Sequence, residues 1–157
     1  DLEVLLEGSG DLRIYGIDAS GHALRLDLNG SGDLEVAELS AETLKLSLAG
    51  SGDMSLGSVV VDASIDVVLK GSGDMTAQER GRAGDVELAI VGSGDIDFRR
   101  IDAVDAEVNI VGSGDARIGE VQSLDVTVLG SGDVHYRGKP DISTTILGSG
   151  RLHDGGD

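Results

Sequence analysis

Seven aspartates recur along this 157-residue chain in one fixed context, Gly-Ser-Gly-Asp. They are Asp11, Asp33, Asp53, Asp74, Asp95, Asp115 and Asp133, and we refer to them as the Asp ladder. Carboxylates that repeat at a fixed spacing can bind divalent cations between them. They can also accept hydrogen bonds from backbone amides at tight turns, as Asx turns do. We expect the turn role for the Asp ladder, with cation binding as the alternative.

Two of the three histidines form a second candidate metal site. His135 stands two residues after Asp133, and His153 stands at the equivalent position of the next repeat, two residues after Arg151. This equivalence predicts that the two rings lie side by side, with Asp133 nearby. Such a group could bind a transition metal, although solvent-facing histidines are the simpler interpretation. In the final repeat Arg151 replaces the aspartate, and we expect it to pair with Asp133.

The amino-acid composition excludes several kinds of site and disfavours several kinds of partner. The absence of cysteine excludes disulfides, thiolate zinc sites and thiol nucleophiles. Twelve Lys and Arg against 29 Asp and Glu leave a net charge of −17, which disfavours nucleic acid and anionic membrane surfaces as partners. No apolar run approaches the roughly 18 residues that a membrane span requires. We therefore predict no nucleic-acid partner, no membrane insertion, no cofactor and no catalytic residue.

The element that carries these residues is an eightfold repeat. Gly-Ser-Gly-Asp occupies 8–11, 30–33, 50–53, 71–74, 92–95, 112–115 and 130–133, and Gly-Ser-Gly-Arg occupies 148–151. Aliphatic residues stand two, four and six positions before the motif in most copies, as Leu44, Leu46 and Leu48 do, with polar residues such as Lys45 between them. Alternation with a period of two predicts strands that have one buried and one exposed face.

Strands that repeat with one fixed corner predict an all-β fold, a single-stranded, right-handed parallel β-helix (β-solenoid). We expect one domain over residues 1–157, with about eight rungs of 18–22 residues, a rung being one circuit of the coil. An antiparallel sandwich is the alternative, but it gives no reason for one motif per repeat. The alternation also predicts that both glycines of each motif face inward at the corner, where a Cβ would crowd the coil.

The residue before each motif should face outward. In the last four rungs it is apolar, and we call Val91, Val111, Leu129 and Leu147 the apolar strip. The strip either folds under the corner or forms an association surface. Basic residues concentrate only at Arg80, Arg82, Arg99 and Arg100, beside Glu79 and Asp102, which predicts a solvated, salt-bridged loop. Arg13–Glu35 and Asp97–Arg117 are predicted cross-strand pairs.

With its repeated Gly-Ser-Gly-Asp corners, each followed by an aliphatic residue, the sequence resembles the head domains of the GIN type from bacterial autotransporter adhesins. The resemblance extends from about Leu2 to Leu152 and lies in the repeat. It implies an exported bacterial right-handed β-helix, pectate-lyase-like in shape without lyase catalytic residues, with a role in adhesion. Arg151 and the 18-residue final rungs depart from the pattern.

We therefore expect a non-enzymatic, exported module of the periplasm or cell surface, whose signal peptide has been removed. Its partner would be a protein or glycan surface ligand, and a weak homo-oligomer could form through the apolar strip or a terminal rung. A self-assembling structural scaffold is the alternative function. A β-helix carbohydrate-active enzyme is less favoured, because the chain has three aromatic residues and no basic groove.

Overall fold

The structure is a computed structural model, and it describes residues 1–155 as strands and connecting turns without a helix. The strands are β1 Leu2–Gly8, β2 Leu12–Ile14, β3 Ile17–Gly30, β4 Leu34–Gly50, β5 Met54–Gly71, β6 Met75–Ala77, β7 Gly81–Gly92, β8 Ile96–Phe98, β9 Ile101–Gly112, β10 Ala116–Glu120, β11 Ser123–Gly130, β12 Val134–Arg137, β13 Asp141–Gly148 and β14 Leu152–Asp154.

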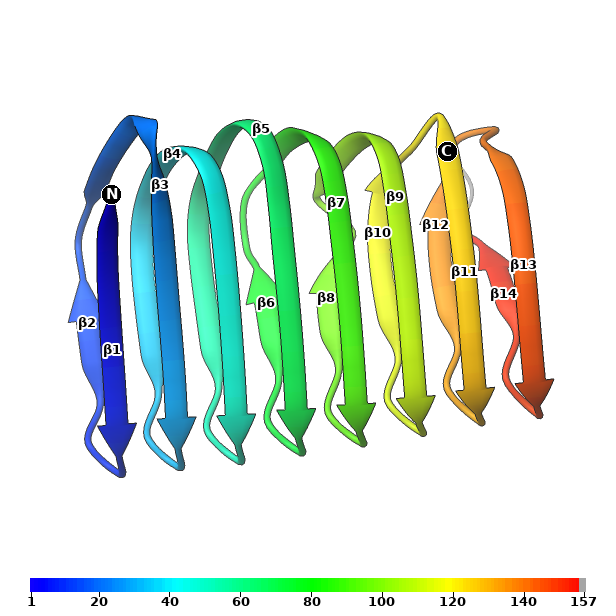
Figure 1. Cartoon of the computed structure of the whole chain (residues 1–157), viewed down its shortest axis with the longest axis horizontal. Helices are drawn as coiled ribbons and strands as arrows, with labels where there is room; N and C mark the ends of the chain where they lie inside the picture. The colour runs from blue at the N-terminus through cyan, green and yellow to red at the C-terminus, as the bar shows by residue number, and fades with distance from the viewer. Residues whose placement is uncertain (156–157) are drawn as a thin grey trace.

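The chain winds as a β-solenoid of about eight rungs (Figure 1). It descends along the strands at the front, returns upward along the paler strands behind, and advances from left to right, so the coil is right-handed. The strands form one 14-stranded sheet, and the paired neighbours are parallel. The prediction of a right-handed parallel β-helix is therefore confirmed, and the antiparallel alternative is wrong.

Each rung has two walls that meet at the Gly-Ser-Gly-Asp corner. The front wall consists of the segments before each corner and includes β1, β7, β9, β11 and β13. The rear wall consists of the segments after each corner and includes β2, β6, β8, β10, β12 and β14. The longer strands β3, β4 and β5 bend around the end opposite the corner (Figure 1). All three contribute to the front wall, and β4 and β5 also contribute to the rear wall.

The core is a stack of aliphatic side chains between the two walls. Equivalent residues are direct register partners, so Leu46, Val67, Leu88 and Val108 follow one another along the coil. Each of these four is 0% exposed, whereas Lys45, Glu87 and Glu107 on the same strands are exposed. This confirms the predicted alternation. Phe98 is the aromatic residue of the core.

The two glycines of each corner differ in backbone conformation and in burial. The first glycine of each motif has a positive φ, between 97° and 136°, which favours glycine over any L-residue. The second glycine, as at Gly52, is buried, and a Cβ there would overlap the carbonyl oxygen of Gly32 in the preceding rung. The first glycines are exposed or half-buried, so the prediction that both glycines face inward is wrong for the first one; a Cβ there would still overlap the preceding rung, as at Gly50 with the carbonyl oxygen of Gly30. The crowding comes from the neighbouring rung's backbone more than from the core.

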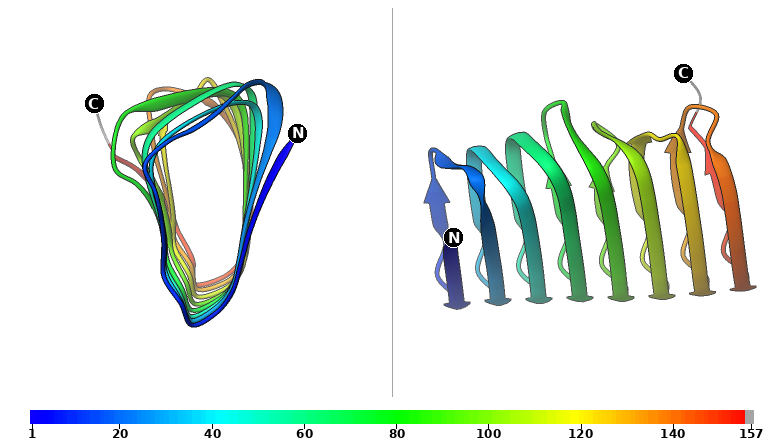
Figure 2. Two further views of the ribbon diagram at one scale, coloured as in Figure 1. Left: turned by 90° about the vertical axis from the view of Figure 1, so that its left-hand side faces the viewer. Right: turned by 45° about the horizontal axis from the view of Figure 1, so that its top comes forward.

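Differences in rung length are absorbed mainly at the end opposite the corner. Register shifts occur there between Ala19 and Ala23, between Ala41 and Thr43, and between Val60 and Ser64. Viewed along the coil, the corners superimpose while the opposite ends diverge (Figure 2). The walls near the corner are thus the regular surfaces on which side chains can line up.

Candidate functional site

The Asp ladder holds neighbouring corners together. Oδ1 of each ladder aspartate accepts a hydrogen bond from a backbone N–H at the same position of the next rung, over 2.8–3.0 Å. Asp53 Oδ1, for example, accepts from the N–H of Asp74 at 3.0 Å. The predicted acceptance of corner amides is confirmed, and the amide comes from the following rung. Cation binding along the ladder would have to compete with these charge-assisted hydrogen bonds.

The final link of the ladder differs from the prediction in one respect. Asp133 Oδ1 accepts from the backbone N–H of Arg151 at 2.9 Å. Within residues 1–155, the guanidinium of Arg151 forms no ion pair with Asp133. The two residues are paired through the main chain, because the position that follows the second glycine directs its amide at the preceding carboxylate whatever its side chain is.

His135 and His153 lie side by side, as predicted. They are register partners on β12 and β14, and their rings are stacked with centroids 4.7 Å apart and planes 15° apart. Nε2 of His153 lies 3.4 Å from Oδ2 of Asp133. Partial burial lowers the pKa of His135, and His153 and Arg117 lower it further, while Asp115 and Asp133 oppose the shift. The three side chains form a compact donor group, with their ligand atoms within 4.8 Å of one another.

The apolar strip lies open on the front wall. Val91, Val111, Leu129 and Leu147 are successive register partners, and their exposed fractions are 47%, 48%, 42% and 64%. Lys70 occupies the same position one rung earlier. The strip therefore does not fold under the corner, and its role as an association surface stays a prediction.

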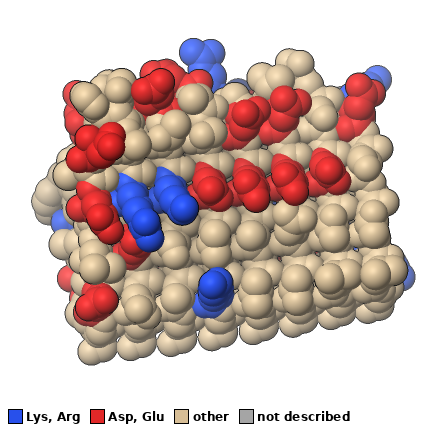
Figure 3. All heavy atoms as spheres, viewed as in Figure 1, with Lys and Arg blue, Asp and Glu red and all other residues tan. Residues whose placement is uncertain are grey.

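A row of carboxylates runs parallel to the strip on the same wall. Asp66, Glu87, Glu107 and Asp125 are register partners on four successive rungs, and we call them the acidic row (Figure 3). A shallow groove of about 520 Å³ follows them. Partial burial, then the charges of Asp66 and Glu107, raise the pKa of Glu87. These four residues occupy exposed positions of the predicted alternation. Their common position, five residues before successive motifs, was the signal that could have revealed the row.

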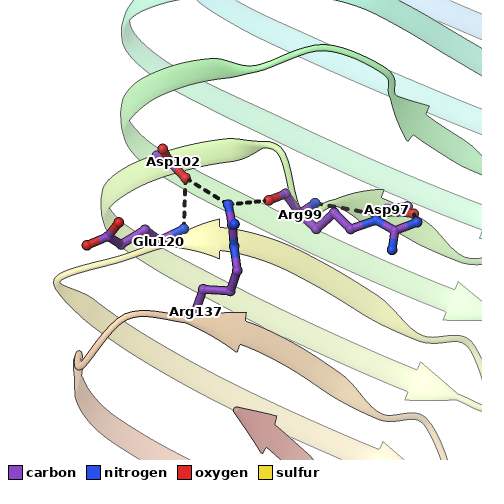
Figure 4. A network of polar contacts seen from close by, with 5 residues as sticks. All are labelled: Asp97, Arg99, Asp102, Glu120 and Arg137. Carbon is purple, nitrogen blue, oxygen red and sulfur yellow. Dashed lines mark hydrogen bonds and ion pairs between the residues drawn. The ribbon is translucent and has the colours of Figure 1, made fainter. Parts of the chain in front are cut away.

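The predicted salt-bridged loop, which carries Arg80, Arg82, Arg99 and Arg100, contains ion pairs. It also includes Arg137, a residue that the sequence did not indicate. Nη2 of Arg137 donates to the carbonyl oxygen of Arg99 at 2.9 Å and lies 3.6 Å from Oδ1 of Asp102 (Figure 4). The same Asp102 oxygen accepts from the N–H of Glu120 at 2.9 Å. Arg137 follows Arg99 by 38 residues and reaches it across the intervening rung, so no local pattern indicated this contact.

The remaining arginines of that region are less constrained. Nη2 of Arg99 pairs with Oδ2 of Asp97 at 2.9 Å, which replaces the predicted Asp97–Arg117 pair. Arg80, Arg82 and Arg100 form no ion pair with any residue in 1–155, so the predicted salt-bridged loop is confirmed only in part. The other predicted pair, Arg13–Glu35, is confirmed at 3.3 Å.

The repeat geometry has a counterpart among known protein families. The family described as "Putative auto-transporter adhesin, head GIN domain" matches residues 1–77 and 20–140. The chain belongs to this family. The resemblance stated from the Gly-Ser-Gly-Asp repeat is therefore confirmed. No significant match exists among curated proteins.

Two solved structures from Parabacteroides distasonis ATCC 8503 share the fold of this GIN family member. One, described as a "putative lipid binding protein", is 28% identical with a TM-score of 0.89. The other, described as a "putative adhesin", is 21% identical with a TM-score of 0.90. Each alignment covers 97% of this chain, but only 61% and 63% of the respective neighbours. The chain thus spans about three fifths of each of these proteins.

The described part of this GIN family member includes no helix that is long and apolar enough to cross a membrane.

Proposed function

We propose that this GIN domain is an exported, non-catalytic module that binds a surface ligand through its front wall. The observation that carries the proposal is the apolar strip, four aliphatic side chains exposed in register on a regular wall. Soluble proteins rarely expose contiguous apolar rows without an interaction to cover them. Membership of an adhesin-head family supports export and a role in surface binding.

The chemistry of the wall narrows the ligand class. On β7, β9 and β11 the residue of the acidic row stands four residues before that of the strip, which is about 13 Å along an extended chain. A ligand that fits both would present apolar groups at one edge and basic groups at the other. The net charge of −17 strengthens the attraction for basic groups at low ionic strength. We therefore favour a protein ligand with an apolar and basic surface over a glycan.

A non-catalytic role is favoured because the carboxylates of the Asp ladder are engaged in holding rungs together. Oδ1 of each accepts a backbone amide, and the same arrangement recurs along the coil. A catalytic carboxylate pair needs two different environments to separate an acid from a base, whereas the ladder repeats one environment. The ladder is therefore an architectural feature.

Binding to immobilised extracellular-matrix proteins and glycans tests the proposal. We expect wild-type protein to bind at least one of them, and Val111→Lys with Leu129→Lys to reduce that binding at least tenfold, because two ammonium groups replace the centre of the strip. The control is Val60→Lys with Val104→Lys, since both valines are exposed, at 52% and 46%, but lie outside the strip. Circular dichroism should show the same fold for all three proteins. Equal binding by the strip variant would contradict the assignment.

Two further candidate functions use the same strip, and each is separated from the first by the assay that detects it. Self-association, which would make the chain a scaffold or a weak homo-oligomer, should appear in light scattering at about 1 mM protein and increase with salt, because salt screens the repulsion between chains. A lipid ligand is suggested by the description of the 28%-identical neighbour. It should appear as binding to phosphatidylcholine vesicles without binding to matrix proteins.

A further inference from the structure

We propose that Asp133, His135 and His153 form a binding site for one divalent first-row transition-metal ion, on the outer face of the rear wall. This site is separate from the apolar strip and does not depend on the proposed function. It uses one side chain that precedes β12, one on β12 and one on β14.

The backbone fixes the three side chains on one face. β12 and β14 pair in parallel, with His135 directly opposite His153. Asp133 stands two residues before His135, and side chains two residues apart along an extended chain share a face. The three donors therefore converge through sheet register, without a mobile loop.

One carboxylate oxygen of Asp133 is available to bind a metal ion. Oδ1 of Asp133 accepts from the N–H of Arg151, as the other ladder aspartates do one rung on. Its Oδ2 points to the imidazoles and lies 3.4 Å from Nε2 of His153. Two donors that each lie about 2.0–2.1 Å from a tetrahedral zinc are about 3.3–3.4 Å apart. Asp133 and His153 thus already stand at a separation that one metal ion can bridge.

His135 completes the donor set with a small movement. The stacked rings are 4.7 Å apart between centroids, and all three ligand atoms lie within 4.8 Å of one another. A tilt that brings the His135 donor closer by at most about 1.4 Å would give the separation of a tetrahedral site. None of the three side chains is fully buried, so solvent borders the group. Three protein ligands leave a position for water or a fourth ligand.

This donor set occurs in only one place along the described coil. At the His135 position, the earlier rungs carry Arg13, Glu35, Ser55, Thr76, Asp97 and Arg117. None of them supplies a second nitrogen ligand. Imidazole suits zinc, copper, nickel and iron, whereas calcium and magnesium prefer oxygen ligands alone. The donors therefore select a transition metal and not the cations expected for an all-carboxylate site.

Zinc titration of the untagged full chain tests the site. By isothermal titration calorimetry with ZnCl₂, we expect one ion per chain, and at least tenfold weaker binding for His135→Gln and for His153→Gln. Asp133→Asn keeps an oxygen that can accept the Arg151 amide but removes the anionic ligand, so it should also weaken binding. The matched control is His22→Gln, which removes an exposed histidine of β3 far from the site and should leave the affinity unchanged.

A second measurement guards against a variant that simply unfolds. Cu²⁺ electron paramagnetic resonance of wild-type protein should show coupling to two nitrogens, reduced to one in His135→Gln and His153→Gln. Circular dichroism verifies the fold of each variant. No zinc binding at 1 mM ZnCl₂, or affinity that is the same in wild type and in both site-histidine variants, would overturn the proposal. Equal weakening by His22→Gln would also overturn it, because the ion would then be bound elsewhere.

Discussion

At the scale of single residues, the second glycine of each corner after the first is required by the rung before it. A Cβ on Gly52 would overlap the carbonyl oxygen of Gly32, whereas Gly10, at the same motif position in the first rung, has no atom within 4 Å of its virtual Cβ. Neither residue has a positive φ. The two glycines therefore differ only in the presence of a preceding rung.

We expect Gly52→Ala to lower the free energy of unfolding by about 3 kcal/mol or more, because the added methyl group must push two corners apart. Gly10→Ala should change it by no more than about 1 kcal/mol, since its methyl group points into open space. Urea denaturation followed by circular dichroism measures both values. Similar losses in the two variants would mean that the glycines serve the local corner conformation and not the contact between rungs.

Residue roles were predictable where the repeat itself placed the contact. The stacked pair His135–His153 and the amide-accepting aspartates follow from equal positions in successive rungs. Arg137 was missed because it contacts Arg99 two rungs away. Arg99 likewise displaced Arg117 as the partner of Asp97, because it lies on the same rung and reaches that carboxylate at 2.9 Å. A long side chain can reach partners on its own rung or on other rungs, and its position in the sequence does not determine which partner it contacts.

At the scale of the strand, the acidic row places like charges directly opposite one another on the front wall. Glu87 lies between Asp66 and Glu107, and its pKa is raised above the ordinary value of 4.5 by partial burial and by these two neighbours. A raised pKa means that the folded state binds the proton more tightly than the unfolded state does. Ionised Glu87 therefore opposes folding at neutral pH, and this opposition disappears when the pH falls below about 4.5.

Glu87→Gln should accordingly raise the melting temperature at pH 7, by an amount on the order of 1–2 °C, because the charge is largely exposed. The gain should vanish below the ordinary pKa of 4.5 and shrink in high salt, which screens the row. Glu42→Gln is the matched control, since it removes the same charge from an exposed position outside the row. Differential scanning calorimetry at several pH values checks both variants. An equal gain from Glu42→Gln would indicate a general effect of net charge.

The burial and the register of the strands are more predictable near the corner of each rung than at the opposite end. Near the corner, an alternation of period two and a fixed motif determine which side chains are buried and which residues are partners, as at Leu88 and Glu87. At the opposite end the rungs differ in length, and the register shifts there between Ala41 and Thr43. The pairing of equivalent positions is interrupted at these shifts, so the repeat alone does not determine which residues are partners there.

At the scale of the whole molecule, each rung is supported mainly by its two neighbours. Leu2 of the first rung is 45% exposed, whereas its register partner Leu24 on the second rung is 1% exposed. Stability in such a stack is close to a sum of rung and interface contributions. We therefore expect that a whole interior rung can be removed and the remaining rungs will still stack.

Deletion of residues 31–50 tests this interchangeability, because it removes one 20-residue rung and joins Gly30 to Ser51. Both Gly30 and Gly50 have positive φ, at 136° and 121°, so the new corner keeps its conformation. Arg25 then lies opposite Asp66 and gains an ion-pair partner. We expect a folded, shorter solenoid with a parallel-β circular dichroism spectrum. Deletion of residues 31–40 removes half a rung and should not fold. Loss of folding in both deletions would contradict a rung-by-rung architecture.

Because successive rungs pair residue for residue, the length of the domain is set by its number of rungs. Each added or removed rung would change its length by about 4.8 Å while leaving its cross-section and both walls unaltered. Chemical groups placed at one motif position are therefore repeated at a pitch that the backbone sets and side chains cannot alter. A binding partner with periodic features at that pitch could engage several rungs at once, and the number of rungs would then set its avidity.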